Sequence, residues 1–283
     1  MPKEPESLGK IGLVLSGGMG KGFFHVGALI AIAKCNIPFS YIVAVSAGAL
    51  AAAKLLEVLP DADASESFAL KYLSQPPFRK RKNILRSVYQ LSDLEQLIAK
   101  WDIKKIMGSE IRLDVIAADL ATGQERVFTN RGGDGGMFLK GVVGSCALPP
   151  LFEPLPVEGR EIVDGGMIKP LPISNAVQEG CETIIVIDGD PRNPELSFGN
   201  YQKRKMLKMG YLVARVNSFS LHQLARKEIE EAYRLKKNLV VIRPQAPLLE
   251  DGTKWNAQDV ARMIAEGKCV ALKELQKAHL IEK

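Results

Sequence analysis

Residues 42–49 read Ile42-Val43-Ala44-Val45-Ser46-Ala47-Gly48-Ala49, an apolar run that changes at Ser46 into small residues. The apolar half is typical of a buried strand, and the small residues suit the start of a helix. A sharp turn from strand to helix pushes the residue at the turn out of the sheet edge. We therefore expect Ser46 to present its hydroxyl group at the end of a strand.

Two further apolar runs end in segments suited to chemistry. Gly12-Leu13-Val14-Leu15-Ser16 leads into Gly17-Gly18-Met19-Gly20-Lys21-Gly22, and Glu161-Ile162-Val163 leads into Asp164-Gly165-Gly166. Open parallel sheets bind ligands at the carboxyl ends of their strands, so we expect the three segments to share one edge. A serine on a tight turn, a loop rich in backbone N–H groups and a carboxylate are the parts of an acyl-transfer site.

Apolar runs and helical patterns alternate along the rest of the chain. Residues 61–101 read as mostly helical and more polar, residues 201–237 as helical with many charges, and residues 255–275 as an amphipathic helix. Residues 113–118 are predicted to form a further strand, and two continuous apolar runs, 183–188 and 239–242, are typical of strands covered on both faces. The pattern predicts an α/β fold, a three-layer sandwich with a mostly parallel central sheet, formed as one domain over residues 1–283.

The composition is ordinary for a soluble globular protein, with 46% hydrophobic and 25% charged residues among 283. The first six residues are charged and broken by proline, unlike a signal peptide. The longest apolar stretch, residues 42–59, is interrupted by Lys54 and Glu57 and is too weak for a membrane span. The four cysteines lie far apart, without metal-like spacing. We expect a cytoplasmic protein with reduced thiols and no metal or cofactor.

The formal net charge of +6 comes with three basic clusters: Arg79-Lys80-Arg81-Lys82, Lys203-Arg204-Lys205 with Lys208, and Lys236-Lys237. Such clusters suit anionic surfaces, although a charge run is commonly only a solvated face. The sequence contains no recognised nucleic-acid-binding motif, which favours phospholipid over nucleic acid. Apolar residues flank the first cluster, so Arg79, Lys80, Arg81 and Lys82 are the candidate for peripheral docking onto an anionic membrane.

The glycine-rich loop, residues 17–22, has three possible functional interpretations. It fails the Walker pattern because Gly22 follows Lys21, and it fails the dinucleotide fingerprint because Phe23 stands where a third glycine is needed. It works as an oxyanion hole, which needs only exposed N–H groups near Ser46. A tight strand-to-helix turn without chemistry is the remaining alternative.

The base that would activate Ser46 is predicted to be a carboxylate. The three histidines do not follow strands as a Ser-His-Asp triad requires: His25 lies in a helical pattern and suits a packed structural role, and His222 and His279 suit the surface. Of two Asp-Gly-Gly sequences, Asp134 lies in a glycine-rich loop, whereas Asp164 follows a strand. We therefore favour Asp164.

On these segments the chain resembles the patatin-like phospholipases, a family of lipid acyl hydrolases that use a Ser-Asp dyad. The resemblance runs from about Gly12 to Pro172 and includes Ser145-Cys146-Ala147-Leu148-Pro149-Pro150-Leu151-Phe152-Glu153-Pro154. It implies that Ser46 is the nucleophile and Asp164 the base. It also implies that the oxyanion hole is formed by the backbone N–H groups of Gly17, Gly18, Met19 and Gly20.

Three positions depart from the family pattern. Met19 stands where the family usually has glycine, so a positive φ there would be strained. Lys21 replaces an arginine and loses its planar fork, and Ala44 replaces the first glycine of the turn. None of the three removes a catalytic side chain.

The resemblance and the motifs together predict a serine acyl hydrolase that cleaves ester bonds of phospholipids or related lipids. The main alternative is a non-catalytic lipid- or partner-binding module on the same fold, in which the departures at Met19 and Ala44 have removed the activity. A nucleotide-binding protein is the third reading, and the failed loop spacings count against it.

Overall fold

The computed structural model describes residues 8–82, 87–191, 208–235 and 237–282. Its central sheet has the strand order β10-β9-β1-β2-β5-β8-β7, with β6 paired to β5. Five strands run parallel to one another: β1 (Ile11–Leu15), β2 (Phe39–Val45), β5 (Arg112–Asp119), β9 (Thr183–Ile187) and β10 (Asn238–Ile242). The prediction of a mostly parallel sheet is confirmed.

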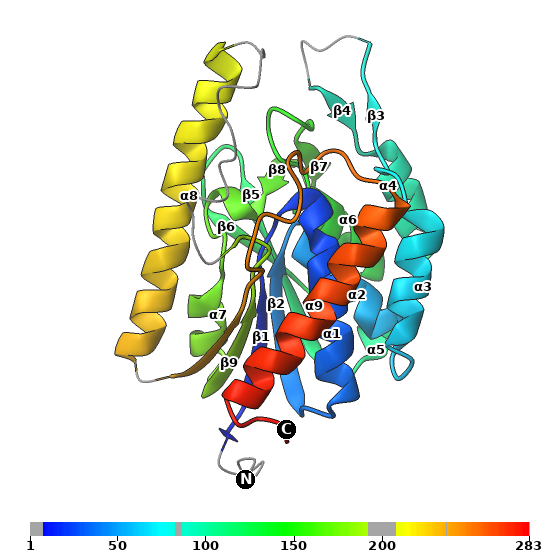
Figure 1. Cartoon of the computed structure of the whole chain (residues 1–283). Coiled ribbons are helices and arrows are strands. Elements are labelled where there is room, and N and C mark those ends of the chain that lie inside the picture. Colours follow the sequence, from blue (N-terminus) through cyan, green and yellow to red (C-terminus); the bar gives the residue numbers. More distant parts are fainter. Residues whose placement is uncertain (1–7, 83–86, 192–207, 236, 283) are drawn as a thin grey trace.

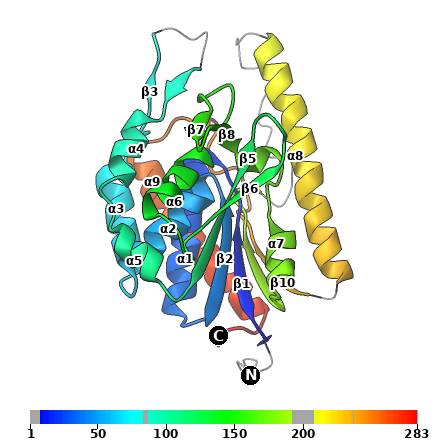
Figure 2. The same ribbon diagram turned by 180° about the vertical axis from the view of Figure 1, so that it is seen from behind.

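Helices cover both faces of this sheet, which gives the predicted three layers (Figures 1 and 2). One face carries α1 (Gly22–Lys34), α2 (Ala47–Val58) and α9 (Ala257–Lys277), and the other carries α7 (Ile173–Gln178) and α8 (Lys208–Arg234). Side chains along a strand alternate between the faces. In β1, Leu13 and Leu15 accordingly pack on the first side and Val14 on the second.

The strand that carries Asp164 differs from the expectation. β8 (Arg160–Asp164) runs antiparallel to β5, and so does β6 (Glu125–Thr129). β7 (Leu155–Val157) in turn pairs antiparallel with β8. Asp164 pairs with Ala117, close to the carboxyl end of β5. Asp164 thus reaches the edge formed by the carboxyl ends of the parallel strands from the opposite direction, because β8 is short and pairs only with the last residues of β5.

Residues 61–101 are less helical than predicted. α3 (Asp63–Tyr72) and α4 (Ser92–Ile98) flank a small antiparallel hairpin of β3 (Arg79–Lys80) and β4 (Tyr89–Gln90). The amides of Val88 and Tyr89 donate to the carbonyls of Pro150 and Leu151, at 3.3 and 2.8 Å. This distant backbone pairing supplies the hydrogen bonds that a helix would otherwise have made.

The remaining helices are α5 (Ile103–Gly108) and α6 (Gly135–Gly144), and single 3₁₀ turns occupy Met19–Lys21 and Gly165–Met167. α9 begins with a capping box of Asn256 and Asp259. It crosses α1 so closely that a Cβ at Gly27 would lie 2.0 Å from the Ile264 carbonyl oxygen. No helix in the described ranges is both long and apolar enough to cross a bilayer.

Candidate active site

Ser46 is the single residue between the end of β2 and the start of α2, and its backbone is strained. It adopts φ 52° and ψ −126°, a region that non-glycine residues rarely occupy. Such a conformation costs about 1–3 kcal/mol and persists only where the surroundings enforce it. Gly48 is needed behind the turn, because a Cβ there would lie 2.5 Å from the Ser16 carbonyl oxygen. Ala44, the departure from the turn pattern, packs fully buried in the core.

Ser145 holds the strained turn in place. Its hydroxyl group accepts a hydrogen bond from the Ser46 amide at 2.7 Å and donates one to the Ile116 carbonyl of β5 at 2.6 Å. Two residues later the Ala147 carbonyl accepts a hydrogen bond from the Asp164 amide at 3.0 Å. Residues 145–147 thus fix Ser46 and Asp164 relative to one another. From the sequence, this segment was recognised only as part of the resemblance to the family, and no role was predicted for it.

Asp164 is buried and lines the same pocket as Ser46. The Gly166 amide donates to its Oδ1 atom at 2.8 Å. Burial raises the pKa of the carboxyl group to about 6, and the hydrogen bonds from Ser46 and Gly166 limit the rise. A carboxylate with this pKa is ionised at neutral pH and is a stronger base than an ordinary aspartate.

The competing aspartate and two of the histidines lie where the sequence predicts. Asp134 is exposed and caps α6 by accepting a hydrogen bond from the Gly136 amide at 2.9 Å. His25 is fully buried on α1, with Nε2 at 3.3 Å from the Ser16 hydroxyl group. Burial and the nearby charge of Lys21 lower the pKa of His25 to about 3, so its ring is neutral. His279 is exposed after α9.

His222 was expected at the surface, and this prediction is wrong. Its half-buried side chain on α8 lines a pocket that also contains Ser46, Asp164 and Asp190. The pattern of α8 in the sequence shows a charged helix but not which turn of it faces the site. Only the packing of α8 against the face of the sheet brings His222 to this pocket.

The glycine-rich loop places three backbone amides near Ser46. Gly18 adopts φ 144° and Met19 φ 53°, so the positive φ anticipated at Met19 is present. A Cβ at Gly17 would lie 3.1 Å from the Ser46 Cβ. Within the described part of the chain, the amides of Gly17, Gly18 and Met19 have no hydrogen-bond acceptor.

Gly20 and Lys21 are turned to other partners. The Gly20 amide donates to the Gly252 carbonyl at 3.1 Å, and the Lys21 amide donates to the Gly18 carbonyl at 3.0 Å. The Lys21 ammonium group forms an ion pair with Asp190. The sequence predicted Gly20 as one of the oxyanion donors. In the structure its N–H group is already hydrogen-bonded to the segment before α9. No pattern in the sequence connected that segment with the site.

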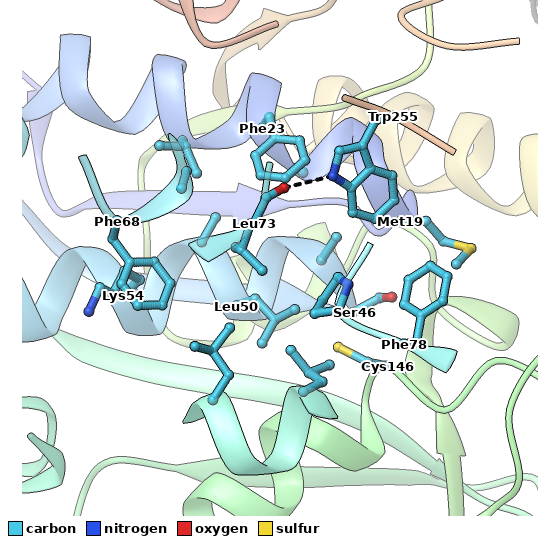
Figure 3. A pocket seen from close by; sticks show the side chains of 18 of the residues that line it. Met19, Phe23, Ser46, Leu50, Lys54, Phe68, Leu73, Phe78, Cys146 and Trp255 are labelled. Atoms are coloured by element: carbon cyan, nitrogen blue, oxygen red, sulfur yellow. Dashed lines mark hydrogen bonds between the residues drawn. The ribbon is translucent and has the colours of Figure 1, made fainter. Parts of the chain in front are cut away.

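Ser46 lies where an apolar channel meets a polar pocket. The channel is lined by residues of α2, α3 and α4. Its wall also includes Met19, Phe23, Phe78, Cys146 and Trp255 (Figure 3). The pocket on the other side is lined by Lys21, Asp164, Asp188, Asp190 and His222. Ser46 therefore borders two compartments, one walled by apolar side chains and one that also carries charged side chains.

Trp255 forms part of the channel wall. Its indole N–H group donates to the Leu73 carbonyl at 2.8 Å, and its ring packs edge-on against Phe23 and Phe78 at centroid distances of 5.5 and 5.8 Å (Figure 3). A Cβ at Gly20 would lie 2.6 Å from this ring. The segment before α9 thus touches both the channel and the glycine-rich loop.

The first basic cluster lies on and beside the β3–β4 hairpin. Arg79 pairs with Asp93 at 2.8 Å, and Arg81 pairs with Glu153 at 2.7 Å. Lys80 and Lys82 are exposed. In the other two clusters, residues 203–205 and 236 lie outside the described residues.

Comparison with known proteins agrees with this architecture. The sequence model of the family described as Patatin-like phospholipase matches residues 13–177, which include Ser46 and Asp164, and the chain belongs to this family. Patatin-like phospholipase domain-containing protein 7 of Mus musculus is 28% identical over 200 residues, which cover 68% of this chain. Lysophospholipase NTE1 of Scheffersomyces stipitis is 27% identical over 224 residues, or 75% of this chain. In each case the match spans only 14% of the relative's length.

A solved structure shares the fold. The crystal structure of VipD from Legionella pneumophila superposes with a TM-score of 0.55 at 15% sequence identity, and the match covers 95% of this chain and 67% of that one.

Proposed function

We propose that this chain is a serine acyl hydrolase that cleaves ester bonds of lipids, with Ser46 as nucleophile and Asp164 as general base. One observation carries the proposal. A strained, buried serine and a buried carboxylate line the same pocket, at the point where that pocket meets an apolar channel. Strain held at such a position is characteristic of functional sites.

The reaction uses only groups of this chain and water. The Asp164 carboxylate accepts the Ser46 proton as Oγ attacks the ester carbonyl carbon, and the carbonyl π electrons move onto oxygen. The amides of Gly17, Gly18 and Met19 stabilise this oxyanion. When the C–O double bond re-forms, the alcohol leaves and takes the proton from Asp164.

A water molecule then completes the cycle. Asp164 accepts a proton from water, whose oxygen attacks the acyl-enzyme carbonyl. Collapse of the second tetrahedral intermediate breaks the bond to Ser46 Oγ, which regains its proton from Asp164 and releases the fatty acid. The raised pKa of Asp164 supports both proton transfers, because the group is ionised yet basic near neutral pH.

The two compartments favour a substrate with one apolar and one polar part. The channel suits the acyl chain and the polar pocket suits the alcohol or head group. The relatives named phospholipase and lysophospholipase support phospholipids with a single acyl chain as the first class to test. Lys80 and Lys82 on the hairpin support peripheral contact with an anionic membrane.

We further propose that residues 1–283 form one catalytic domain, and that the residues beyond the stretch matched by the family are part of it. Gly252 bonds to the glycine-rich loop and Trp255 closes the channel, although both lie beyond the stretch matched by the family. The apolar channel therefore includes a residue from beyond the stretch that the family model matches.

Labelling by a lipid-like fluorophosphonate, followed by intact mass, tests the proposal. We expect one adduct on the wild type, none on Ser46→Ala and slow labelling of Asp164→Asn. A folded wild type that takes no adduct would favour the non-catalytic binding module. An adduct that persists in Ser46→Ala would mean that another side chain is the nucleophile.

A further inference from the structure

The end of the apolar channel farthest from Ser46 is polar. Three side chains from separate elements line it there: Lys54 on α2, Ser65 on α3 and Trp101 after α4. Phe68 lies among them, with its ring centroid 3.9 Å from the Lys54 ammonium nitrogen and 6.0 Å from the Trp101 ring. A channel that binds only hydrocarbon has no need of these polar groups.

Two of the polar atoms are buried without a partner. Ser65 is 3% exposed and Trp101 8%, and neither the Ser65 Oγ atom nor the Trp101 Nε1 atom has a hydrogen-bond partner in the described ranges of the chain. Buried polar groups in folded proteins are nearly always hydrogen-bonded, and an unpaired one is costly. Each of these two groups on the channel wall lacks a hydrogen bond that a polar atom of a bound molecule can supply.

The charge at this end is balanced. The Lys54 ammonium group pairs with the Glu57 carboxylate at 2.5 Å, and their side chains are only 12% and 13% exposed. The uncompensated groups are therefore the Trp101 N–H, which can only donate, and the Ser65 hydroxyl group, which can donate or accept. A neutral oxygen fits this set, whereas a carboxylate would enter without a free counter-ion.

The position of these groups matches the end of a bound acyl chain. Ser46, Leu50 and Lys54 follow one face of α2 at intervals of one helical turn, and Figure 3 shows Leu50 between Ser46 and the far end. The rise of an α-helix places Lys54 about 12 Å from Ser46 along the axis. An acyl chain whose carbonyl lies at Ser46 would extend over Leu50 toward Ser65 and Trp101.

We propose that Ser65 and Trp101 form a subsite for a neutral oxygen, a hydroxyl or carbonyl group, at the tail end of the acyl chain. The inference rests on the proposed function in one respect, that the channel receives the acyl part of the substrate. It adds that the preferred acyl group is oxygenated at its tail. The Trp101 N–H donates to that oxygen, and the Ser65 hydroxyl group completes its hydrogen bonding.

Binding of saturated methyl esters to the Ser46→Ala protein tests this without requiring catalysis. In a series from octanoate to hexadecanoate, each ω-hydroxy ester is compared with the isomer that carries the hydroxyl group at mid-chain. We expect the ω-hydroxy isomer to bind about tenfold more tightly at one chain length, and Ser65→Ala or Trp101→Phe to remove most of that preference. The inference fails if no length shows a preference, or if both variants retain it.

Two controls sharpen the result. Trp255→Phe removes an indole N–H that is already bonded to Leu73, so it should change the binding of both isomers alike. An ω-carboxylate ester that binds more tightly than its ω-hydroxy counterpart would overturn the neutral subsite. Hydrolysis by the wild type is measured separately. An ω-hydroxy preference without hydrolysis would refute only the proposed reaction, and hydrolysis without the preference would refute only the subsite.

Discussion

The Ser145 hydroxyl group accepts a hydrogen bond from the backbone amide of Ser46 at 2.7 Å, and neither residue is more than 5% exposed. The same hydroxyl group donates to Ile116 on the strand that pairs with β8. One side chain therefore links the strained turn to the strand that positions Asp164.

Replacement of Ser145 by alanine should misplace Ser46. We expect Ser145→Ala to lower the rate of fluorophosphonate labelling about 10- to 100-fold, because small displacements of reacting groups are costly. The free energy of unfolding should fall by about 1–3 kcal/mol, since the Ser46 amide and the Ile116 carbonyl lose their partner. Thr183→Val is the matched control: it removes a buried hydroxyl group that donates to Leu8 at 2.6 Å, so it should lower stability without slowing labelling. Equal labelling of Ser145→Ala and wild type would contradict the bracing role.

The pH dependence of hydrolysis should report Asp164. The base must be ionised, so kcat/KM for a soluble ester should rise with pH and level off above the raised pKa of about 6. The midpoint is measured from initial rates between pH 4 and 8, values chosen to span about two units on either side. A midpoint near the ordinary aspartate value of about 4 would show that the reaction does not depend on the ionisation of an Asp164 with a raised pKa.

Substitution of Asp164 should stabilise the protein while it inactivates the site. Because burial raises the pKa of Asp164, the folded state holds its proton more tightly than the unfolded state. Ionisation therefore opposes folding progressively from about pH 4 to pH 6 and fully above that range. We expect Asp164→Asn to raise the free energy of unfolding by about 1–3 kcal/mol at pH 8 and by much less at pH 4, measured by urea denaturation.

A second buried aspartate provides a control of opposite sign. The hydrogen bond from Arg160 holds the pKa of Asp119 below its ordinary value, so Asp119→Asn should lose stability at pH 8. If both asparagine variants shift stability in the same direction, the environment assigned to Asp164 is wrong.

Trp255 should matter more to long acyl chains than to short ones. Trp255→Ala removes a wall of the channel, so the ratio of kcat/KM for dodecanoyl over acetyl esters should fall about tenfold, which corresponds to the contacts of about two methylene groups. Trp255→Phe keeps an aromatic wall and should retain most of the ratio. An unchanged ratio in Trp255→Ala would mean that the acyl chain does not pass this residue.

Membrane docking through the hairpin should depend on its exposed lysines. Arg79 and Arg81 already have carboxylate partners, whereas Lys80 and Lys82 are exposed. We expect Lys80→Ala with Lys82→Ala to weaken co-sedimentation with phosphatidylserine vesicles about 10- to 30-fold at low salt, since each basic residue near an anionic surface contributes about 1 kcal/mol. Lys104→Ala with Lys105→Ala makes the same charge change on α5 and should have little effect. Equal binding of the wild type to neutral and anionic vesicles would refute this docking surface.

Local pattern was enough to predict the layers of the fold. Largely apolar runs identified β1, β2, β5, β9 and β10, because strands covered on both faces are rich in apolar residues. The positions of Ser46 and Asp164 followed from their place at strand ends. The direction of β8 could not be predicted in this way, since an apolar triplet reads the same in a parallel and an antiparallel strand.

The features that sequence reasoning missed depend on contacts between distant residues. Ser145 looks like an ordinary small residue until its hydroxyl group meets Ser46, 99 positions away. Gly20 looks like another oxyanion donor until Gly252 takes its N–H group. The hairpin within residues 61–101 forms on a backbone edge at Pro150 and Leu151 that no local pattern reveals.

The acyl channel also bears on how this chain can change over evolutionary time. Ser46 and Asp164 both lie in the stretch shared with the family, whereas Trp255, which closes the channel, lies about ninety residues beyond Asp164, outside that stretch. Substitutions around Trp255 can alter which molecules fit without altering the residues proposed to react with them. The other residues that line the channel lie within the shared stretch, so Trp255 is a point at which selection can change the wall while that stretch stays constant.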